Sequence, residues 1–155
     1  MSDIKYYWED LAVGFVDEFG DKLVSKEEIL DFARQFDPQP FHLDEEAAAK
    51  SLFGGLCASG WHTGAMAMRL LCDRILTKSA CLGSPGMENL RFFKPVFVGD
   101  RLRMRFEVME SRPLNKRLDV GTCNCRWELF NQHDEMVMQL NGNLMFGRRP
   151  AAEKS

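Results

Sequence analysis

The sequence lacks any long hydrophobic run and any strong excess of charge of one sign. No apolar stretch approaches the roughly 18 residues that cross a bilayer, and Met1–Asp10 has neither the basic nor the apolar region of a secretion signal. The 20 lysines and arginines nearly balance the 23 aspartates and glutamates, giving a net charge of −3. The basic field of a nucleic-acid-binding protein is therefore missing. We expect a cytoplasmic protein that binds neither membranes nor nucleic acids.

Cysteine and histidine are also scarce, and their spacing does not indicate a metal site. The five cysteines lack the paired spacing of zinc ligands, and the three histidines are widely dispersed. The sequence has no Gly-rich nucleotide-binding loop and no Gly-x-Ser-x-Gly motif. These absences predict no metal, no cofactor and no covalent catalysis. They also predict reduced thiols at Cys57, Cys72, Cys81, Cys123 and Cys125.

The chain is, however, rich in apolar residues for its length. Its 155 residues are 45% hydrophobic and include 12 phenylalanines and 9 methionines, enough to bury a core without disulfide or metal staples. No linker or repeat interrupts the pattern, so we expect one domain over residues 1–149 and a frayed tail over 150–155. Helical patterns precede strand patterns, which predicts the α+β class.

The first half contains several local structure signals. Residues 15–24 predict two short strands about a tight turn at Gly20. Ser25, followed three residues later by a glutamate, is the capping box of a helix over residues 26–36. Asp44 is suited to cap a second, short helix.

The middle of the sequence predicts one long helix over residues 59–76. Apolar residues occur around most of its girth, so we expect it to be buried on several sides at the centre of the fold. Arg69, Asp73 and Arg74 would mark the stripe that reaches water. After it, alternating apolar residues predict an antiparallel meander with a bulge near Gly121, over residues 87–93, 101–108, 117–130 and 135–146.

The segment between the two predicted helices of the first half combines polar side chains with prolines that restrict the backbone. Asp37 and His42 lie five residues apart on it, and Pro38 and Pro40 limit the conformations between them. A carboxylate and an imidazole held in this way can take a proton from water and deliver one to carbon. The alternative is structural: Asp37 caps a turn and His42 packs as a histidine with satisfied hydrogen bonds.

A second candidate feature leads into the long helix. Gly60 lies at its first turn, where backbone N–H groups have no partner within the helix and the dipole favours negative charge. The Gly60 amide could therefore stabilise an oxyanion. Alternatively, Ser59 is only the N-cap and Gly60 allows close packing. His62 could be a third catalytic group or an ordinary core or surface histidine, and His133 is expected in a solvated hairpin.

Together, DPQPFHLDEEAAAKSLFGGLCASGWHTGAMAMRLL and ENLRFFKPVFVGDRL resemble the MaoC-like acyl dehydratases, which include the (R)-specific enoyl-CoA hydratases. The resemblance covers about residues 10–147. It implies a hot-dog fold, in which an antiparallel sheet wraps a long central helix. It also implies reversible addition of water across the double bond of a trans-2-enoyl-CoA. Asp37 would be the base, His42 would position the water or supply a proton, and the Gly60 amide would hold the thioester oxygen.

The resemblance has further implications for binding. Coenzyme A would enter only as part of the substrate, and the chain would form a homodimer or higher homo-oligomer. Gln39 and Ser59 depart from the Asn and His that are common in the family. Two other functions remain open: an acyl-CoA thioesterase on the same fold, and a non-catalytic acyl-thioester binding protein. The expected substrate-binding residues are Gln39, Phe41, Leu56, Ser59 and Trp61, with Met66 also lining the acyl tunnel.

Overall fold

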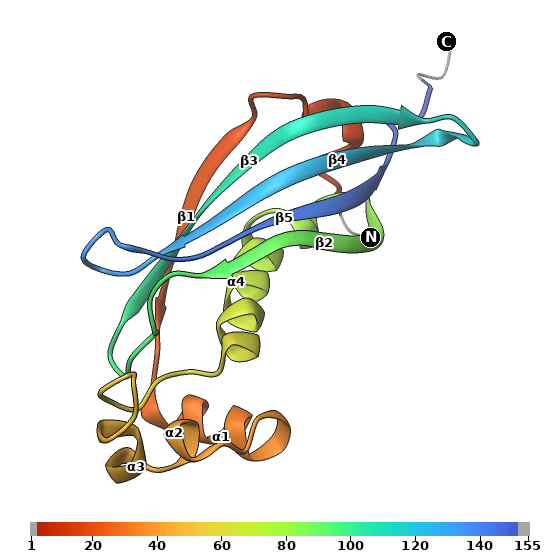
Figure 1. Cartoon of the computed structure of the whole chain (residues 1–155). Helices are drawn as coiled ribbons and strands as arrows, with labels where there is room; N and C mark the ends of the chain where they lie inside the picture. Colours follow the sequence, from red (N-terminus) through yellow and green to blue (C-terminus); the bar gives the residue numbers. More distant parts are fainter. Residues whose placement is uncertain (1–2, 152–155) are drawn as a thin grey trace.

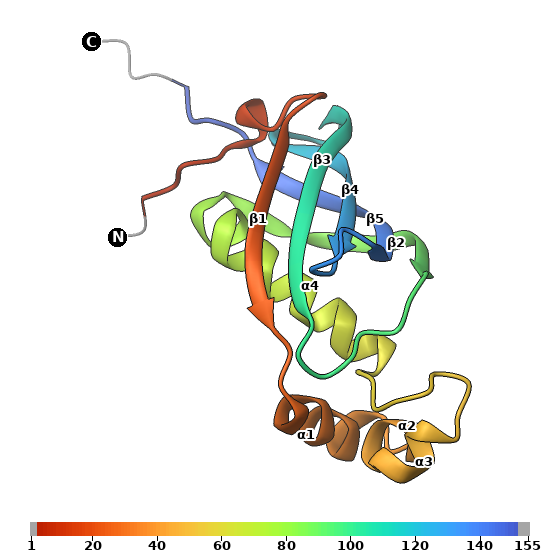
Figure 2. The ribbon, with the colours of Figure 1, turned by 90° about the vertical axis from the view of Figure 1, so that its left-hand side faces the viewer.

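A single antiparallel sheet curves around one long helix in the computed structural model, which describes residues 3–151 (Figures 1 and 2). Five strands lie in the order β1-β3-β4-β5-β2, and helix α4 packs against the concave face of the sheet. This is the expected hot-dog fold, and it confirms the α+β class. The strands are β1 (Val16–Leu23), β2 (Cys81–Phe92), β3 (Arg101–Leu114), β4 (Arg117–Phe130) and β5 (Met136–Gly147).

The predicted meander is present only for β3, β4 and β5, because β2 pairs with β5 at the edge of the sheet and not with β3. The two faces of these three strands follow the period-two alternation of the sequence. In β3, inward side chains from Leu102 to Val108 are fully buried while their neighbours reach the outer face. Strand β2 is longer than predicted and lies at the edge of the sheet, where it pairs only with β5. His133 is exposed in the turn between β4 and β5, as expected.

The predicted pair of short strands over residues 15–24 is wrong. One strand, β1, continues through this segment and pairs with β3 on both sides of a register shift between Phe19 and Lys22. Gly20 has a φ of +109° at this shift, so it forms a bulge within the strand rather than a turn between two strands. The Gly20 backbone also lies against the Leu70 side chain of α4, where a Cβ would approach to 3.0 Å.

Three shorter helices gather beyond one end of the sheet, beside the start of α4 (Figure 1). Helix α1 (Lys26–Phe36) begins where predicted, because the Ser25 hydroxyl accepts a 3.1 Å hydrogen bond from the Glu28 amide. Helix α2 (Pro40–Leu43), which was not predicted, starts at a proline. Helix α3 (Glu45–Ala49) is capped by Asp44 as expected.

Helix α4 (Gly60–Arg74) is the predicted central helix, but it is not buried on several sides. The sheet covers only one side of it, and on the open side the Trp61 side chain is 71% exposed. The exposed stripe includes the predicted Arg69, Asp73 and Arg74. It also includes Trp61 and Ala65, which were not predicted to be exposed. The side facing the fold buries His62, Thr63, Met66, Ala67 and Leu71.

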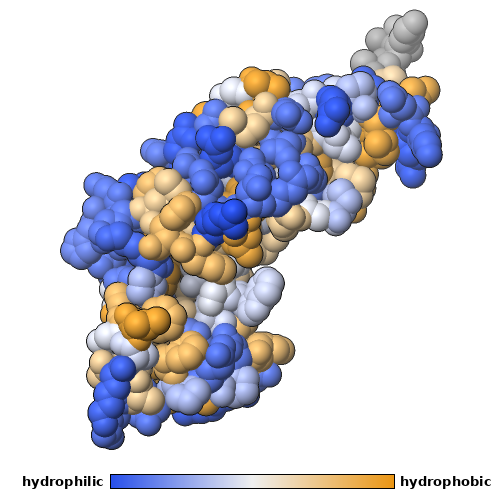
Figure 3. All heavy atoms as spheres, in the orientation of Figure 1, coloured by the Kyte–Doolittle hydropathy of each residue, from blue (hydrophilic) through white to orange (hydrophobic). Residues whose placement is uncertain are grey.

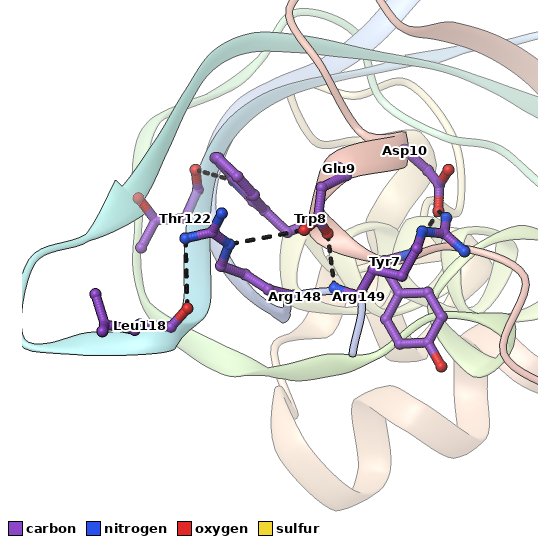
Figure 4. A network of polar contacts seen from close by, with 8 residues as sticks. All are labelled: Tyr7, Trp8, Glu9, Asp10, Leu118, Thr122, Arg148 and Arg149. Carbon is purple, nitrogen blue, oxygen red and sulfur yellow. Dashed lines mark hydrogen bonds and ion pairs between the residues drawn. The ribbon is translucent and has the colours of Figure 1, made fainter. Parts of the chain in front are cut away.

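At the far end of the sheet, the segment before β1 is joined to the segment after β5. The Glu9 carboxylate accepts a 2.8 Å hydrogen bond from the Arg149 amide and lies 3.7 Å from the Arg148 guanidinium. The Asp10 carboxylate pairs with the Arg149 side chain. Figure 4 shows these contacts together with Tyr7, Trp8, Leu118 and Thr122. The two segments therefore hold each other against the sheet.

The Trp8 indole in this cluster explains the glycine at position 121. A Cβ on Gly121 would lie 2.3 Å from the Trp8 ring, and the indole N–H donates to the neighbouring Thr122 carbonyl at 3.3 Å. The predicted irregularity near Gly121 is confirmed, since the pairing of β3 with β4 shifts register between Gly121 and Arg117. Gly121 is needed here because the indole occupies the space of a side chain.

Two expectations from the composition, on membrane-spanning segments and on thiols, can be compared with the structure of residues 3–151. None of the helices in this range is long and apolar enough to cross a membrane. The five cysteines are free thiols, three of them buried and two half-buried. The predicted tail over residues 150–155 lies mostly outside the described residues.

Candidate active site

Three polar side chains come together where α1 ends and where α2 and α4 begin. They are those of Asp37, His42 and Ser59. Asp37 is the C-cap residue of α1, His42 lies in α2, and Ser59 is the N-cap residue of α4. The Asp37 Oδ2 atom lies 3.6 Å from His42 Nε2 and accepts a 2.6 Å hydrogen bond from the Ser59 hydroxyl. The carboxylate and the imidazole therefore face one another.

The Asp37 carboxylate is held by hydrogen bonds at both oxygens. Its second oxygen, Oδ1, accepts a 2.6 Å hydrogen bond from the Gln39 side-chain amide. Burial acts to raise the pKa of Asp37, but the hydrogen bonds from Ser59 and Gln39 and the nearby His42 ring outweigh it and lower that pKa below its usual value. Asp37 is consequently ionised at neutral pH.

The His42 ring is oriented by the backbone. Its Nδ1 atom lies 2.7 Å from the Cys57 carbonyl oxygen, and because a carbonyl can only accept, Nδ1 carries the hydrogen. Nε2 is then the nitrogen that faces Asp37. The Phe41 ring packs edge-on against the imidazole at 4.6 Å. The pair can therefore act on a molecule that contacts both Oδ2 and Nε2.

The Cys57 thiol lies close to this histidine but is not suited to nucleophilic attack. Its sulfur is 3.8 Å from His42 Nδ1, the nitrogen that carries the hydrogen. Burial raises the pKa of Cys57 to about 11, so almost none of it is thiolate at neutral pH. Cys57 is therefore not poised to act as a nucleophile at neutral pH.

A cavity of 270 Å³ opens beside the pair, between the start of α4 and the segment after β2. His42 and Gly60 line it, whereas Asp37 reaches it only through its contact with the imidazole. Gly60 is the first residue of α4, so its amide precedes the hydrogen bonds of the helix. The other lining residues are Phe53, Cys57, Ala58, Thr63, Phe92, Phe93, Lys94, Pro95 and Val96.

This arrangement agrees with what is found in known proteins. A family model described as MaoC like domain matches residues 16–124, which include all of these polar groups. The chain belongs to the MaoC-like dehydratase family. It is 40% identical to a MaoC-like dehydratase structure from Rhodospirillum rubrum, with a TM-score of 0.87 over 94% of this chain and 99% of that one.

Two further relatives have more specific names. The 3-hydroxybutyryl-CoA dehydratase of Methylorubrum extorquens is 33% identical over 120 residues, which is 77% of this chain and 73% of that protein. The structure of the R-hydratase PhaJ1 from Pseudomonas aeruginosa is 26% identical, with a TM-score of 0.72 over 92% of this chain and 86% of that one.

In this MaoC-like protein, the remaining residues expected to bind substrate do not line the cavity. Gln39 is exposed and bonds to Asp37, and Phe41 is half-buried against His42. Leu56 is buried in the core, as is Met66, while Trp61 projects from the open side of α4.

Sequence reasoning missed the residues that form most of the cavity wall. Phe53, Phe92 and Phe93 line it, and each is at least 38% exposed. The segment RFFKPV forms part of the family resemblance, but its apolar character is equally typical of an ordinary strand and does not place its rings in a cavity. The Phe92 and Phe93 rings reach the cavity because β2 ends beside the start of α4, whereas Phe53 lies in the segment between α3 and α4.

His62 belongs to a different contact. Its ring is 6% exposed and stacks on Phe32 of α1 at 4.8 Å. Burial lowers the pKa of His62, with the Glu28 carboxylate opposing this shift. The ring therefore joins α4 to α1 and does not line the cavity. Within residues 3–151, no three histidine, cysteine or acidic side chains are grouped to hold a metal ion.

Proposed function

We propose that the protein is an enoyl-CoA hydratase that adds water reversibly to a trans-2-enoyl-CoA to give a 3-hydroxyacyl-CoA. The observation that carries the proposal is the 3.6 Å separation between Asp37 Oδ2 and His42 Nε2 beside the start of α4. A water molecule between these atoms can hydrogen bond to both. The dehydratase and hydratase names of the relatives support this reaction class.

In the proposed hydration, the water oxygen attacks the β-carbon of the enoyl group as Asp37 takes one of its protons. Because His42 Nδ1 donates to the Cys57 carbonyl, Nε2 is free to accept the other water hydrogen and orient the attack. The π electrons move to the thioester oxygen as an enolate. A proton from the Asp37–His42 pair then adds to the α-carbon, which restores the pair. Dehydration follows the same steps in reverse.

The Gly60 amide is the proposed partner of the thioester oxygen. An N–H at the first turn of a helix has no partner within the helix, and the helix dipole favours negative charge there. A donor directed at the oxygen where charge develops stabilises the transition state more than the ground state. Coenzyme A is thus part of the substrate, and the reaction needs no separate cofactor.

The remaining residues have supporting roles in this proposal. Ser59 and Gln39 keep Asp37 ionised and oriented through their hydrogen bonds. Phe41 fixes the orientation of the His42 ring. Leu56 and Trp61 would contact substrate only through movement or through a second subunit, because one is buried and the other projects away from the cavity.

We also propose that the protein is a homodimer joined along β2 and the open side of α4. The edge strand exposes Leu82 and Met87, and α4 exposes Trp61 on the side that the sheet does not cover. Figure 3 shows hydrophobic patches interrupting the hydrophilic surface on the face that it presents. Apolar surface of this kind marks interaction sites. Light scattering should give twice the 17.8 kDa mass of the chain; a monomer would contradict the proposal.

The function is tested by following the ultraviolet absorbance of crotonyl-CoA and longer or branched trans-2-enoyl-CoA thioesters, with a thiol reagent in parallel. We expect wild type to remove the enoyl absorbance without releasing thiol, and Asp37→Asn to abolish this. Asp44→Asn is the matched control, because Asp44 caps α3 and asparagine also caps helices. Thiol release would identify a thioesterase instead. Ligand-induced thermal stabilisation without turnover of any substrate would identify a binding protein.

A further inference from the structure

The Phe92 ring occupies the space that the missing side chain of Gly60 leaves open. A Cβ built on Gly60 would lie 2.8 Å from two carbons of this ring, closer than real Cβ contacts occur. The glycine therefore does not give a ligand free access to the Gly60 Cα, because an aromatic ring already covers it. Any group bound at the Gly60 amide lies next to Phe92.

The backbone of Phe92 is fixed, although its ring is not part of the core. Phe92 is the last residue of β2 and pairs with Met138, and the following amide donates to the Val137 carbonyl at 2.9 Å. The side chain nevertheless remains 50% exposed. A smaller side chain here would thus enlarge the cavity at little cost to the core.

The cavity that Phe92 helps to enclose is small. Its 270 Å³ lies below the roughly 300–1,000 Å³ of pockets that hold drug-sized ligands. Three aromatic rings, those of Phe53, Phe92 and Phe93, form much of its wall. The three atoms nearest to a Cβ built on Gly60 all belong to the Phe92 ring.

We propose that Phe92 is a specificity-determining residue that restricts the substrate to short acyl chains; this rests on the hydratase function proposed above. With the thioester oxygen at the Gly60 amide and the β-carbon at the Asp37–His42 pair, the acyl chain must fit beside the Phe92 ring. We expect a short chain, such as the butyryl group, to fit beside the ring without moving it. A longer chain has to displace the ring or remain in solvent.

The expected effect is measured on binding of saturated, unreactive thioesters. Each methylene that enters an apolar site contributes about 0.8 kcal/mol, so the four extra methylenes of octanoyl-CoA would tighten binding about 200-fold over butyryl-CoA in an open site. In wild type, we expect the two dissociation constants to differ by less than about tenfold. In Phe92→Ala, octanoyl-CoA should gain at least about tenfold relative to butyryl-CoA, with Phe92→Leu intermediate.

Isothermal titration calorimetry of wild type, both Phe92 variants and Leu118→Ala tests this proposal. Leu118 is the matched control, because it is an exposed apolar side chain at the start of β4 that neither lines the cavity nor lies in the proposed dimer contact. The Phe92→Leu variant keeps an apolar side chain in place if the alanine variant does not fold. Hydration of crotonyl-CoA and trans-2-octenoyl-CoA is measured on the same preparations.

The outcomes separate the two proposals. A changed binding ratio without any hydration would support the role of Phe92 and overturn the hydratase function. Hydration by wild type with an unchanged ratio in both Phe92 variants would overturn the role of Phe92. The same conclusion would follow if wild type already bound octanoyl-CoA about a hundredfold more tightly than butyryl-CoA. No binding of either thioester would overturn both.

Discussion

Replacing Ser59 with alanine should affect both stability and the pH dependence of activity, because its hydroxyl makes two contacts at once. The hydroxyl donates to the Asp37 carboxylate at 2.6 Å and accepts from the Trp61 amide as the N-cap of α4. Loss of an N-cap costs about 1 kcal/mol. Loss of a hydrogen bond to a charged group costs about 1.5–3 kcal/mol more, since Ser59 is buried and its carboxylate partner is only 14% exposed.

Ser25→Ala is the matched control for this prediction. Ser25 caps α1 in the same way, but the Glu28 carboxylate that its hydroxyl contacts is 42% exposed and also pairs with Lys22. We expect Ser25→Ala to cost about 1 kcal/mol and Ser59→Ala about 3 kcal/mol in urea unfolding. At roughly 2–4 °C per kcal/mol for a chain of this size, Tm should fall by about 2–4 °C and 6–12 °C respectively.

The pH dependence gives a second, independent measurement. The lowered pKa of Asp37 contributes stability that is present above its ordinary value of 3.8 and is lost as pH falls through the folded-state pKa. Without the Ser59 hydroxyl, one of the hydrogen bonds that oppose the effect of burial on Asp37 is lost, so the folded-state pKa of Asp37 rises. The acid limb of kcat/KM for crotonyl-CoA should therefore move to higher pH in Ser59→Ala only. Equal stability losses and identical acid limbs in the two variants would refute this reasoning.

The remaining predictions concern three other contacts. Asp37→Asn and His42→Ala should each lower turnover at least about a hundredfold while the fold is retained; wild-type rates in either variant would remove the pair from the mechanism. Gly121→Ala should expel the Trp8 indole and cost about 1–3 kcal/mol, which thermal unfolding would detect. Since the pKa of His62 is lowered from 6.5 in the fold, its stability contribution is complete above pH 6.5 and is lost as pH falls through the folded-state pKa. His62→Phe should weaken this acid sensitivity below about pH 6.5, and an unchanged pH profile of urea unfolding would disprove it.

Local patterns predicted those parts of the fold whose causes are local. The capping residues Ser25 and Asp44 identify helix starts because their side chains bond to amides two or three residues away. The alternation over residues 101–108 identifies the buried face of β3, because one face of the strand meets the core. The open side of α4 was not predictable in this way. Periodicity identifies apolar stripes on a helix, but it does not say which stripe the sheet covers.

The candidate site shows the same division between local and distant causes. Asp37 and His42 were identified because they lie on one short segment restricted by prolines. The bond between Ser59 and Asp37 joins residues 22 positions apart, and the contact between Phe92 and Gly60 depends on where β2 ends relative to α4. Such contacts follow from tertiary packing. The sequence shows the residues that form these contacts but does not indicate that they lie close together in space.

The joined segments at the far end of the sheet have a consequence for engineering. Glu9 and Asp10 contact Arg148 and Arg149 directly, while Asp37 and His42 lie among the helices at the opposite end (Figure 1). The two segments lie in contact, and chain ends that lie close together tolerate circular permutation. New ends could then be opened in the exposed turn between β4 and β5. An affinity tag or a second enzyme fused to either segment would likewise be attached on the side of the protein remote from the cavity.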